Sequence, residues 1–263
     1  MKFIHIHQIL LRRNIDLYIF LIILLFKLIL KETHMKNKQV IGFILALLSG
    51  LVFGQECIFY YPETEGAELV YQHFDNKDKI TGKTSQKVTV YRQTANGAEA
   101  EIAVKSFDDK GELIADYLLE VRCEAGIFYF DISGYINQEM IKAYENMEMK
   151  VSTENLEMPS NLKEGQILKD GKITMDISNS GMKLMTMEVD ISDRKVVGKE
   201  NVTPPAGRFE CYKITQTTTT KMGMKMVVKS TEWLSPGTGM IKSESYSGSD
   251  KYMGKSELVE INR

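Results

Sequence analysis

The stretch ELVYQHFD at residues 68–75, followed by NKD at residues 76–78, decides the fold. Leu69 and Tyr71 alternate with Glu68, Val70 and Gln72, so the pattern has a period of two. Side chains alternate between the two faces of a β-strand, and this period therefore predicts a strand. The Asn, Lys and Asp residues that follow are typical of a turn, so we expect the chain to reverse into an antiparallel hairpin.

The same arrangement continues along the chain. A second alternating run, KVTVY at residues 87–91, is followed by Asn96-Gly97, and a third run ends at the turn residues DDKG at 108–111. Further strands are predicted at residues 112–122, 127–132, 172–177, 183–191, 196–202, 208–219, 224–234, 240–246 and 252–261. A sheet of roughly ten or more strands must curl or close to bury its apolar face.

One segment has a different period. Apolar residues recur every three to four positions between Ile136 and Met147, which predicts an amphipathic helix over residues 135–149. The expected fold is therefore mainly β: a large curved antiparallel sheet, forming a half-barrel or open barrel, with one amphipathic helix packed against it.

The N-terminal residues have the layout of an export signal. After Met35 come two lysines, an apolar run over residues 40–48 and the small-residue sequence Val52-Phe53-Gly54. This order predicts a signal peptide over residues 35–54 and a mature chain over 55–263 that forms a single β-rich domain. Residues 1–34, which contain another apolar run, are then an N-terminal extension produced by placing the start of translation too early.

Two alternatives concern membrane attachment. Residues 17–30 could form a true membrane helix, although Lys27 lies inside the run. A lipid anchor on Cys57 is disfavoured because Glu56 occupies a position where a small residue is needed. We therefore expect membrane contact only through the N-terminal export segment.

Net charge changes when that segment is separated. The whole chain has 33 Lys and Arg against 35 Asp and Glu, for a net charge of -2. Residues 1–54 contain seven basic and two acidic groups, so residues 55–263 carry 26 basic and 33 acidic groups, a net charge of -7. An acidic domain argues against binding to nucleic acid or to anionic lipid.

Residues for catalysis are scarce. After residue 54 the chain contains one histidine, His73, in a predicted strand without a nucleophile motif nearby. A Ser-His-Asp or Cys-His hydrolase or a zinc site would need more partners than the sequence supplies. We expect no enzyme activity, no catalytic residues, no cofactor and no metal site built from His and Cys.

The three cysteines allow three alternative single disulfides. An exported chain tends to oxidise its thiols. Cys57 begins the mature chain and Cys123 ends a predicted strand, so a bridge between them would fix the N-terminus. Cys211, which lies between Phe209 and Tyr212, would then be a buried free thiol.

Methionine is abundant, with 15 residues in the chain and several in Met-x-Met groups. Met-x-Met on a strand places both thioethers on one face, where they could bind Cu(I), line an adaptable apolar cavity or simply fill the core. The cavity interpretation selects Met185, Met187, Met224 and Met226, together with Trp233 as a core anchor at the cavity rim.

An ordered set of short strings carries a family resemblance. It comprises Cys57 with Tyr60-Tyr61-Pro62, Pro159-Ser160-Asn161-Leu162, Arg194-Lys195-Val196, Pro205-Ala206-Gly207, Cys211-Tyr212-Lys213-Ile214 and Glu232-Trp233 with Gly239-Met240. The set resembles the TapB-like family of exported bacterial proteins, and Pro204 departs from the Thr expected before Pro-Ala-Gly. The resemblance implies an envelope-located, β-rich half-barrel similar to the LolA-type lipoprotein carriers, and it supplies no catalytic residue.

The sequence thus predicts a non-enzymatic exported protein that binds an apolar, lipid-like ligand in its curved sheet. It would work in the periplasm, at the outer membrane or outside the cell. A structural or protein-interaction module of the envelope with a filled core is the first alternative, and a methionine-based copper binder is the second. The expected partners are an apolar ligand or an envelope protein.

Overall fold

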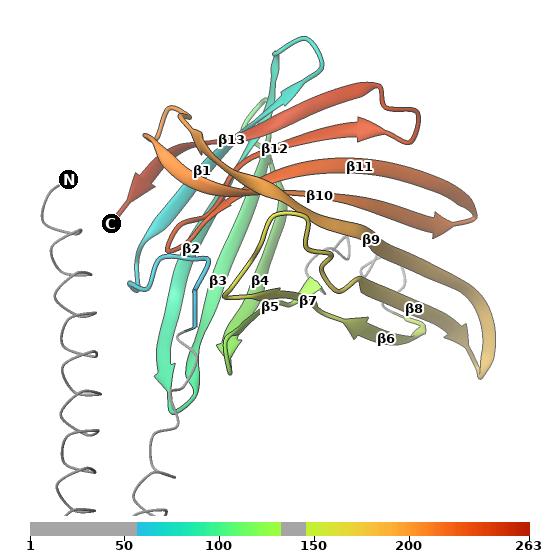
Figure 1. Cartoon of the computed structure of the whole chain (residues 1–263). Helices are drawn as coiled ribbons and strands as arrows, with labels where there is room; N and C mark the ends of the chain where they lie inside the picture. The colour runs from blue at the N-terminus through green and yellow to red at the C-terminus, as the bar shows by residue number, and fades with distance from the viewer. Residues whose placement is uncertain (1–56, 133–145) are drawn as a thin grey trace, which may run out of the picture. The chain divides into compact units, whose positions relative to one another are not determined.

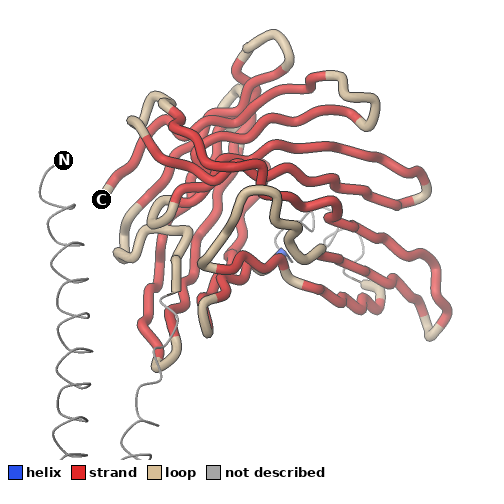
Figure 2. The backbone as a smooth tube through the Cα atoms, viewed as in Figure 1, coloured by secondary structure: helices blue, strands red, loops and turns tan. Residues whose placement is uncertain are grey.

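The computed structural model describes residues 57–132 and 146–263, which form thirteen β-strands and no α-helix (Figures 1 and 2). In chain order the strands are β1 Glu68–Asp75, β2 Ile80–Thr94, β3 Gly97–Asp108, β4 Leu113–Glu124, β5 Ile127–Phe130, β6 Glu148–Glu154, β7 Leu156–Pro159, β8 Gly171–Asn179, β9 Met182–Val202, β10 Phe209–Met222, β11 Met224–Ser235, β12 Gly239–Ser247 and β13 Tyr252–Asn262.

All thirteen strands belong to one sheet, and each neighbouring pair is antiparallel. The order is β6-β8-β9-β10-β11-β12-β13-β1-β2-β3-β4-β5-β7, so the strands nearest the two chain ends, β1 and β13, lie side by side. The sheet curves into a nearly closed barrel (Figure 1). This architecture confirms the predicted mainly β fold with one large curved antiparallel sheet.

The segment between β7 and β8 ties one edge of the sheet to β9. The edge strands β6 and β7 are separated in the chain by a single residue. After β7 the backbone makes three hydrogen bonds to β9: Gly165 N donates to Val196 O at 2.8 Å, Val196 N to Gln166 O at 2.9 Å and Leu168 N to Arg194 O at 2.8 Å. These bonds supply partners for backbone groups that an open edge would expose.

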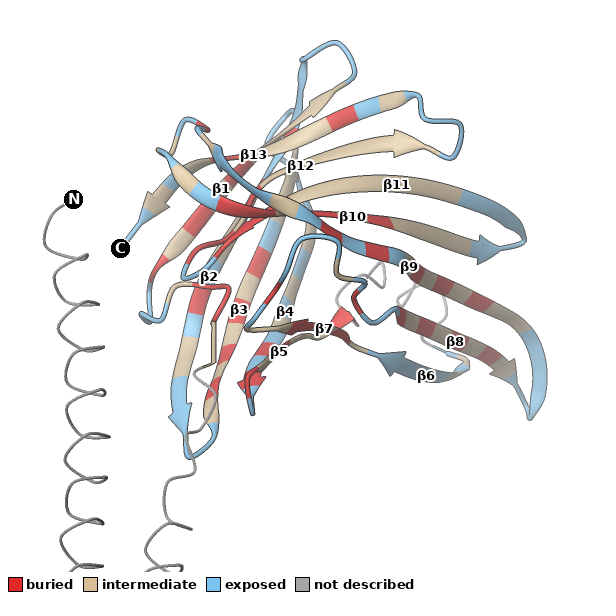
Figure 3. Ribbon diagram, viewed as in Figure 1, coloured by how far each residue is buried: buried red, intermediate tan, exposed pale blue. Residues whose placement is uncertain are grey.

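Buried apolar side chains form two clusters. The larger one includes Leu69, Ile102, Phe128 and Ile214, which come from strands far apart in the chain. The smaller one is built mainly from β8 and β9 and includes Met175. Figure 3 shows the buried positions alternating with less buried ones along β8 and β9, as expected for strands with one buried face.

An aromatic segment before β1 packs into the larger cluster. Phe59, Tyr60 and Tyr61 are all buried, with 6% or less of their surface exposed. The rings of Phe59 and Tyr60 make edge-to-face contacts with Phe128, with centroids 5.1 and 5.5 Å apart. The aromatic segment therefore covers one end of the sheet, where otherwise apolar strand residues would meet water.

Gly239 permits the backbone of this aromatic segment to approach the turn between β11 and β12. Its φ is +102°, and a Cβ at this position would lie 2.7 Å from the carbonyl oxygen of Tyr60. In the same turn, Gly237 N donates a 2.8 Å hydrogen bond to Phe59 O. A side chain at residue 239 would therefore push the aromatic segment away from the barrel end.

A disulfide joins Cys57 to Cys123 on β4, with 5.8 Å between the Cα atoms. This is the cysteine pair favoured from the sequence, and it anchors the aromatic segment from its N-terminal side. Cys211 is free and buried, and burial together with nearby carboxylates raises the pKa of its thiol to about 12. Its thiol is therefore protonated and unreactive at neutral pH.

Several sequence-based boundaries were wrong. The helix predicted over residues 135–149 falls mainly on residues 133–145, which lie outside the described residues, and its last two residues begin β6 instead. The two strands predicted at 183–191 and 196–202 are one long strand, β9, because its irregular register bends the ladder without ending it.

The predicted extension and signal peptide at residues 1–54 also lie outside the described residues. One compact unit extends over Gly54–Arg263 and contains all thirteen strands, both apolar clusters and the disulfide. In the part of the chain that is described, no helix has the length and apolar character needed to cross a membrane.

Candidate functional site

An inner cavity of about 180 Å³ is lined by side chains from β2, β4, β5, β7, β9, β10, β11 and β12, together with Tyr61 and Asp131. Apolar side chains form much of its wall, including Tyr61, Leu119, Phe130, Met158, Ile214 and Leu234. Polar side chains complete the wall: Gln86, Asp131, Arg194, Gln216 and Glu232. A concave, mostly apolar site with a few polar groups is the usual form of a small-molecule binding site.

Strand register places these groups on one face of the sheet. On β10 and β11, Ile214 lies directly opposite Glu232, and two residues further along Tyr212 lies opposite Leu234. Directly paired residues share a face, and so do residues two positions apart on one strand. An apolar cavity wall and its polar groups therefore come from the same inner face.

Arg194 reaches this inner face through a β-bulge. Thr215 pairs with Lys195 and Thr217 with Ser192, so two residues of β9 lie opposite the single residue Gln216. Asp193, the first residue of the bulge, has a φ of +54°, in the left-handed region. The bulge changes the phase of the strand, which is the usual way that a sheet redirects one side chain.

The guanidinium of Arg194 is almost fully buried, with 2% of the residue exposed. It donates hydrogen bonds to the carbonyl oxygens of Lys169 at 2.6 Å and Glu157 at 3.2 Å, and to Gln216 Oε1 at 3.3 Å. Gln216 Nε2 in turn donates to Glu232 Oε1 at 2.8 Å. These hydrogen bonds through Arg194, Gln216 and Glu232, which we call the polar chain, therefore run from the β7–β8 segment across the cavity wall to β11.

Glu232 is the acidic group at the end of these hydrogen bonds. Burial raises the pKa of its carboxyl, while the nearby Arg194 guanidinium and a hydrogen bond from Ser230 partly oppose the rise. A carboxylate in an apolar wall is costly unless it is paired, which explains why the polar chain ends there.

The described residues offer no clear catalytic arrangement. Both ring nitrogens of His73 are hydrogen-bonded to hydroxyls, to Ser256 Oγ at 2.7 Å and to Thr84 Oγ1 at 2.8 Å, and burial lowers the pKa of its imidazole. Within residues 57–132 and 146–263, no group of three or more His, Cys, Asp or Glu side chains is placed to hold a metal ion. The cavity is suited to binding, because it combines apolar surface with fixed polar groups.

The residues predicted from the methionine pattern lie in three separate places. Met187 is buried in the smaller apolar cluster, and Met185 packs against that cluster. Met224 and Met226 lie beside the β10–β11 turn, with 85% and 58% of their surface exposed. Trp233 is buried on the face opposite to Ile214 and Leu234. The structure does not bring these five residues together, and none of them lines the inner cavity.

Trp233 is held by charged neighbours instead. The ammonium groups of Lys213 and Lys242 each lie 5.0 Å from its ring centroid, and its indole N–H donates to Glu200. These cation–π contacts cover the ring on the outer face of the sheet. Its role in this structure is that of a packing anchor.

A second, more polar depression lies on the outer face of β2–β5 and has a volume of about 300 Å³. Its two arginines are already engaged: Arg92 Nη1 lies 2.9 Å from Glu99, and the Arg122 guanidinium lies 4.5 Å from the ring centroid of Tyr129. Because both arginines are engaged and its surface is open, this depression is a weaker candidate than the inner cavity.

The polar chain was not predicted from the sequence, although one spacing in the sequence indicates the inward direction of Arg194. Ile191 and Val196 are both buried, yet five positions separate them, and an odd spacing between two same-face residues requires a bulge. Arg194 is in phase with Val196 and so must point inward. No local pattern indicates that Gln216 and Glu232 meet it, because their contact depends on strand pairing.

Comparisons with known proteins establish the family. A family model described as DUF3108-like matches residues 64–258. The crystal structure of a Bacteroides fragilis protein, predicted to be exported and described as having a YmcC-like fold, is similar, with a TM-score of 0.65 and 21% sequence identity over 79% of this chain and 100% of that chain. A Parabacteroides distasonis protein predicted to be a lipoprotein has a TM-score of 0.66 and 20% identity, with the same coverage.

At these identities the two structures show a shared fold and nothing more. A comparison with curated proteins finds no match. The TapB-like resemblance is not confirmed by these comparisons. The family model, by contrast, spans well over half of the sequence, from the residues before β1 to the middle of β13. The chain belongs to the DUF3108-like family.

Proposed function

We propose that this protein is an exported, non-enzymatic binding protein of the cell envelope that holds a small apolar group in its inner cavity. The observation that carries the proposal is the cavity itself: buried side chains such as Met158, Ile214 and Leu234 surround empty space on the inner face of the sheet. A core that served only to stabilise the sheet would be close-packed. The space therefore argues against the alternative of a structural module with a filled core.

Cavity size limits the ligand. A volume of about 180 Å³ is below the range of about 300–1,000 Å³ that is typical of sites for drug-sized ligands. We therefore infer that one short acyl chain, or the end of a longer one, enters the cavity. The polar chain at Arg194 and Glu232 would lie next to a hydrogen-bonding group of the same ligand.

Three features support the export part of the proposal. Residues 35–54 have the order of charged, apolar and small residues that is typical of a signal peptide. Cys57 and Cys123 form a disulfide, which persists mainly in oxidising compartments. The two structurally similar proteins are predicted to be exported or to be lipoproteins.

A copper-binding role has less support. Met222 lies opposite Met224, and Met226 is two residues further along β11, so the three thioethers share one face at a hairpin tip. Lys225 lies between Met224 and Met226 in the sequence. Its positive charge opposes the binding of a cation at this tip.

Filling the cavity should weaken the binding of an apolar probe. Leu119→Trp adds a large ring from the cavity wall, and we expect it to weaken binding of the fluorescent probe 1-N-phenylnaphthylamine by about tenfold or more, because the ring occupies the ligand's space. The unit Gly54–Arg263 is titrated with the probe, and decanoate is then added as a competitor. Met240→Trp, from the part of the wall that β12 forms, provides a second blocked cavity.

Leu118→Trp is the matched control. Leu118 precedes Leu119 on β4, points to the other face and is 60% exposed, so the same substitution leaves the cavity unchanged. Circular dichroism and the unfolding midpoint verify that each variant is folded. Unchanged probe affinity in folded Leu119→Trp and Met240→Trp proteins would contradict the proposal.

A further inference from the structure

Two neighbouring hairpins expose large apolar side chains at the same end of the sheet. The β8–β9 and β10–β11 turns share this end because β9 and β10 are adjacent antiparallel strands joined at the opposite end. Figure 3 shows both tips as exposed. We define the apolar tip as the five residues Met182 (70% exposed), Leu184 (52%), Met222 (43%), Met224 (85%) and Met226 (58%).

Met222, Met224 and Met226 of the apolar tip lie on one face of the β10–β11 hairpin, whereas single exposed apolar residues are common on any protein surface. Lys221, next to Met222, pairs with Glu188 of β9, and the β8–β9 hairpin continues from there to Leu184 and Met182. Unbranched methionine side chains adapt to surfaces that have no fixed shape. This property suits contact with fluid acyl chains better than contact with one defined protein pocket.

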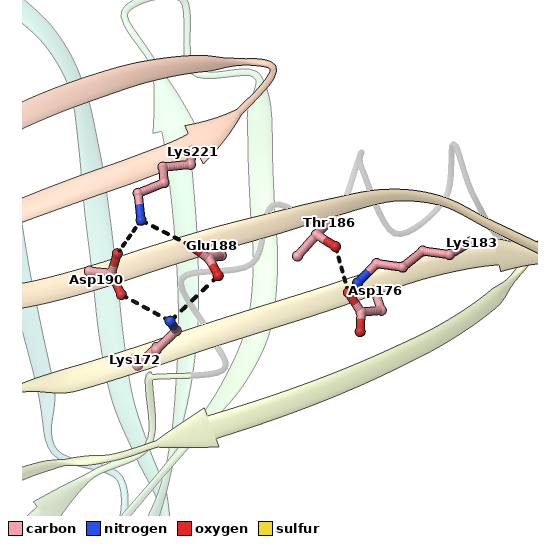
Figure 4. A network of polar contacts seen from close by, with 7 residues as sticks. All are labelled: Lys172, Asp176, Lys183, Thr186, Glu188, Asp190 and Lys221. Carbon is pink, nitrogen blue, oxygen red and sulfur yellow. Dashed lines mark hydrogen bonds and ion pairs between the residues drawn. The ribbon is translucent and has the colours of Figure 1, made fainter.

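Charge changes sign toward the apolar tip. Lys172 on β8 and Lys221, which directly precedes Met222, alternate with Glu188 and Asp190 at nitrogen–oxygen distances of 3.0 to 3.5 Å (Figure 4). Asp176 binds Lys183 at 2.6 Å in the same figure. Residues 177–187 and 222–228 contain no acidic residue, and Lys225 lies between Met224 and Met226 at the β10–β11 turn.

The end of the two hairpins therefore differs from the rest of the domain, which has a net charge of -7 over residues 55–263. Exposed apolar side chains next to lysines are the combination by which proteins bind the surface of an anionic bilayer. We propose that the β8–β9 and β10–β11 hairpins dock this protein on anionic membranes, with the apolar tip inserted at the level of the headgroups and Lys225 facing lipid phosphates.

This docking surface is separate from the inner cavity. None of its five residues lines the cavity, and it needs no ligand there. It also corrects the argument from net charge: repulsion between an acidic domain and an anionic surface is screened over roughly 8 Å at physiological salt, so the charges nearest the contact dominate. Membrane contact would then not be confined to the N-terminal export segment.

Vesicle binding tests the proposal. The unit Gly54–Arg263 is used without the N-terminal apolar runs, which would bind lipid by themselves. We expect it to co-float with vesicles of phosphatidylglycerol and phosphatidylethanolamine, and to bind vesicles of phosphatidylcholine several-fold less. The double variant Met224→Ser/Met226→Ser should lower the partition coefficient on anionic vesicles by about tenfold, and Lys225→Glu should lower it by several-fold.

The β3–β4 hairpin supplies a matched control at the same end of the sheet. Leu113 and Ile114 are 53% and 57% exposed, but three acidic residues of the turn flank them. Leu113→Ser/Ile114→Ser should change the partition coefficient less than twofold. The proposal is overturned if the unit does not bind anionic vesicles, or if the β3–β4 variant loses binding while the apolar-tip variant keeps it. All substitutions lie on the surface, and the unfolding midpoint verifies that each variant is folded.

Discussion

Replacing both Cys57 and Cys123 with alanine is expected to lower the free energy of unfolding by about 4 kcal/mol. The bridge joins residues 66 positions apart, and a cross-link of this span removes much of the conformational freedom of the unfolded chain. It also holds the aromatic segment at Phe59–Tyr61 against β4 and β5. Loss of the disulfide should therefore cost stability and loosen one end of the barrel.

Urea unfolding of the unit Gly54–Arg263, followed by tryptophan fluorescence, measures this change. The unmodified protein in dithiothreitol should unfold at nearly the same urea concentration as the double variant, and the variant itself should not respond to dithiothreitol. If the reduced and oxidised forms have equal midpoints, the bridge does not contribute to stability and this part of the account is wrong.

Arg194→Met is expected to lower the free energy of unfolding by about 3–5 kcal/mol. The substitution removes the donors that hold the carbonyl oxygens of Lys169 and Glu157, so the β7–β8 segment loses its tie to β9. It also leaves Gln216 and the carboxylate of Glu232 without the nearby positive charge. An uncompensated charge in an apolar wall accounts for much of the expected loss.

The effect of Arg194→Met should depend on pH. Burial already raises the pKa of Glu232 above 4.5, the ordinary value, and removing the opposing cation raises it further. A carboxyl whose pKa is higher in the folded state stabilises the fold most below its unfolded pKa, and this contribution is lost as pH rises through its folded pKa. The variant should therefore lose less stability near pH 5 than near pH 7.5.

The double variant Arg194→Met/Glu232→Gln is the control for this interpretation. Glutamine has nearly the same shape as glutamate and no charge, so it should recover part of the stability at neutral pH and remove most of the added pH dependence. A double variant as unstable as Arg194→Met alone, at both pH values, would show that the loss arises only from the severed backbone contacts.

Strand positions could be predicted from the sequence because a strand with one buried face alternates apolar and polar residues along its own length. Alternation at Leu69 and Tyr71 and the turn at residues 75–78 are local signals, and the structure forms β1 and its hairpin there. Strands β6 and β7 were missed because their sequences are short and β6 is largely exposed. A strand without a buried face need not alternate apolar and polar side chains.

The cavity was harder to predict, because its wall is assembled by pairing between distant strands. Leu119 and Leu118 are adjacent apolar residues on β4, and only the register with β3 shows which of them points inward. Conversely, Met224 and Met226 look like core residues in the sequence but lie at an exposed hairpin tip. Hydrophobic composition identifies apolar side chains and does not reveal whether a neighbouring element covers them.

The most direct test of the central claim is a methyl NMR titration of the unit Gly54–Arg263 with decanoate. If the inner cavity holds an acyl chain, the methyl signals that shift should be those of Leu119, Met158, Leu234 and Met240, all of which line the cavity. Signals of Met224 and Met226 should respond to anionic vesicles and not to decanoate at low concentration. Decanoate shifts confined to these exposed methionines, or no shift at the four cavity residues, would contradict the account.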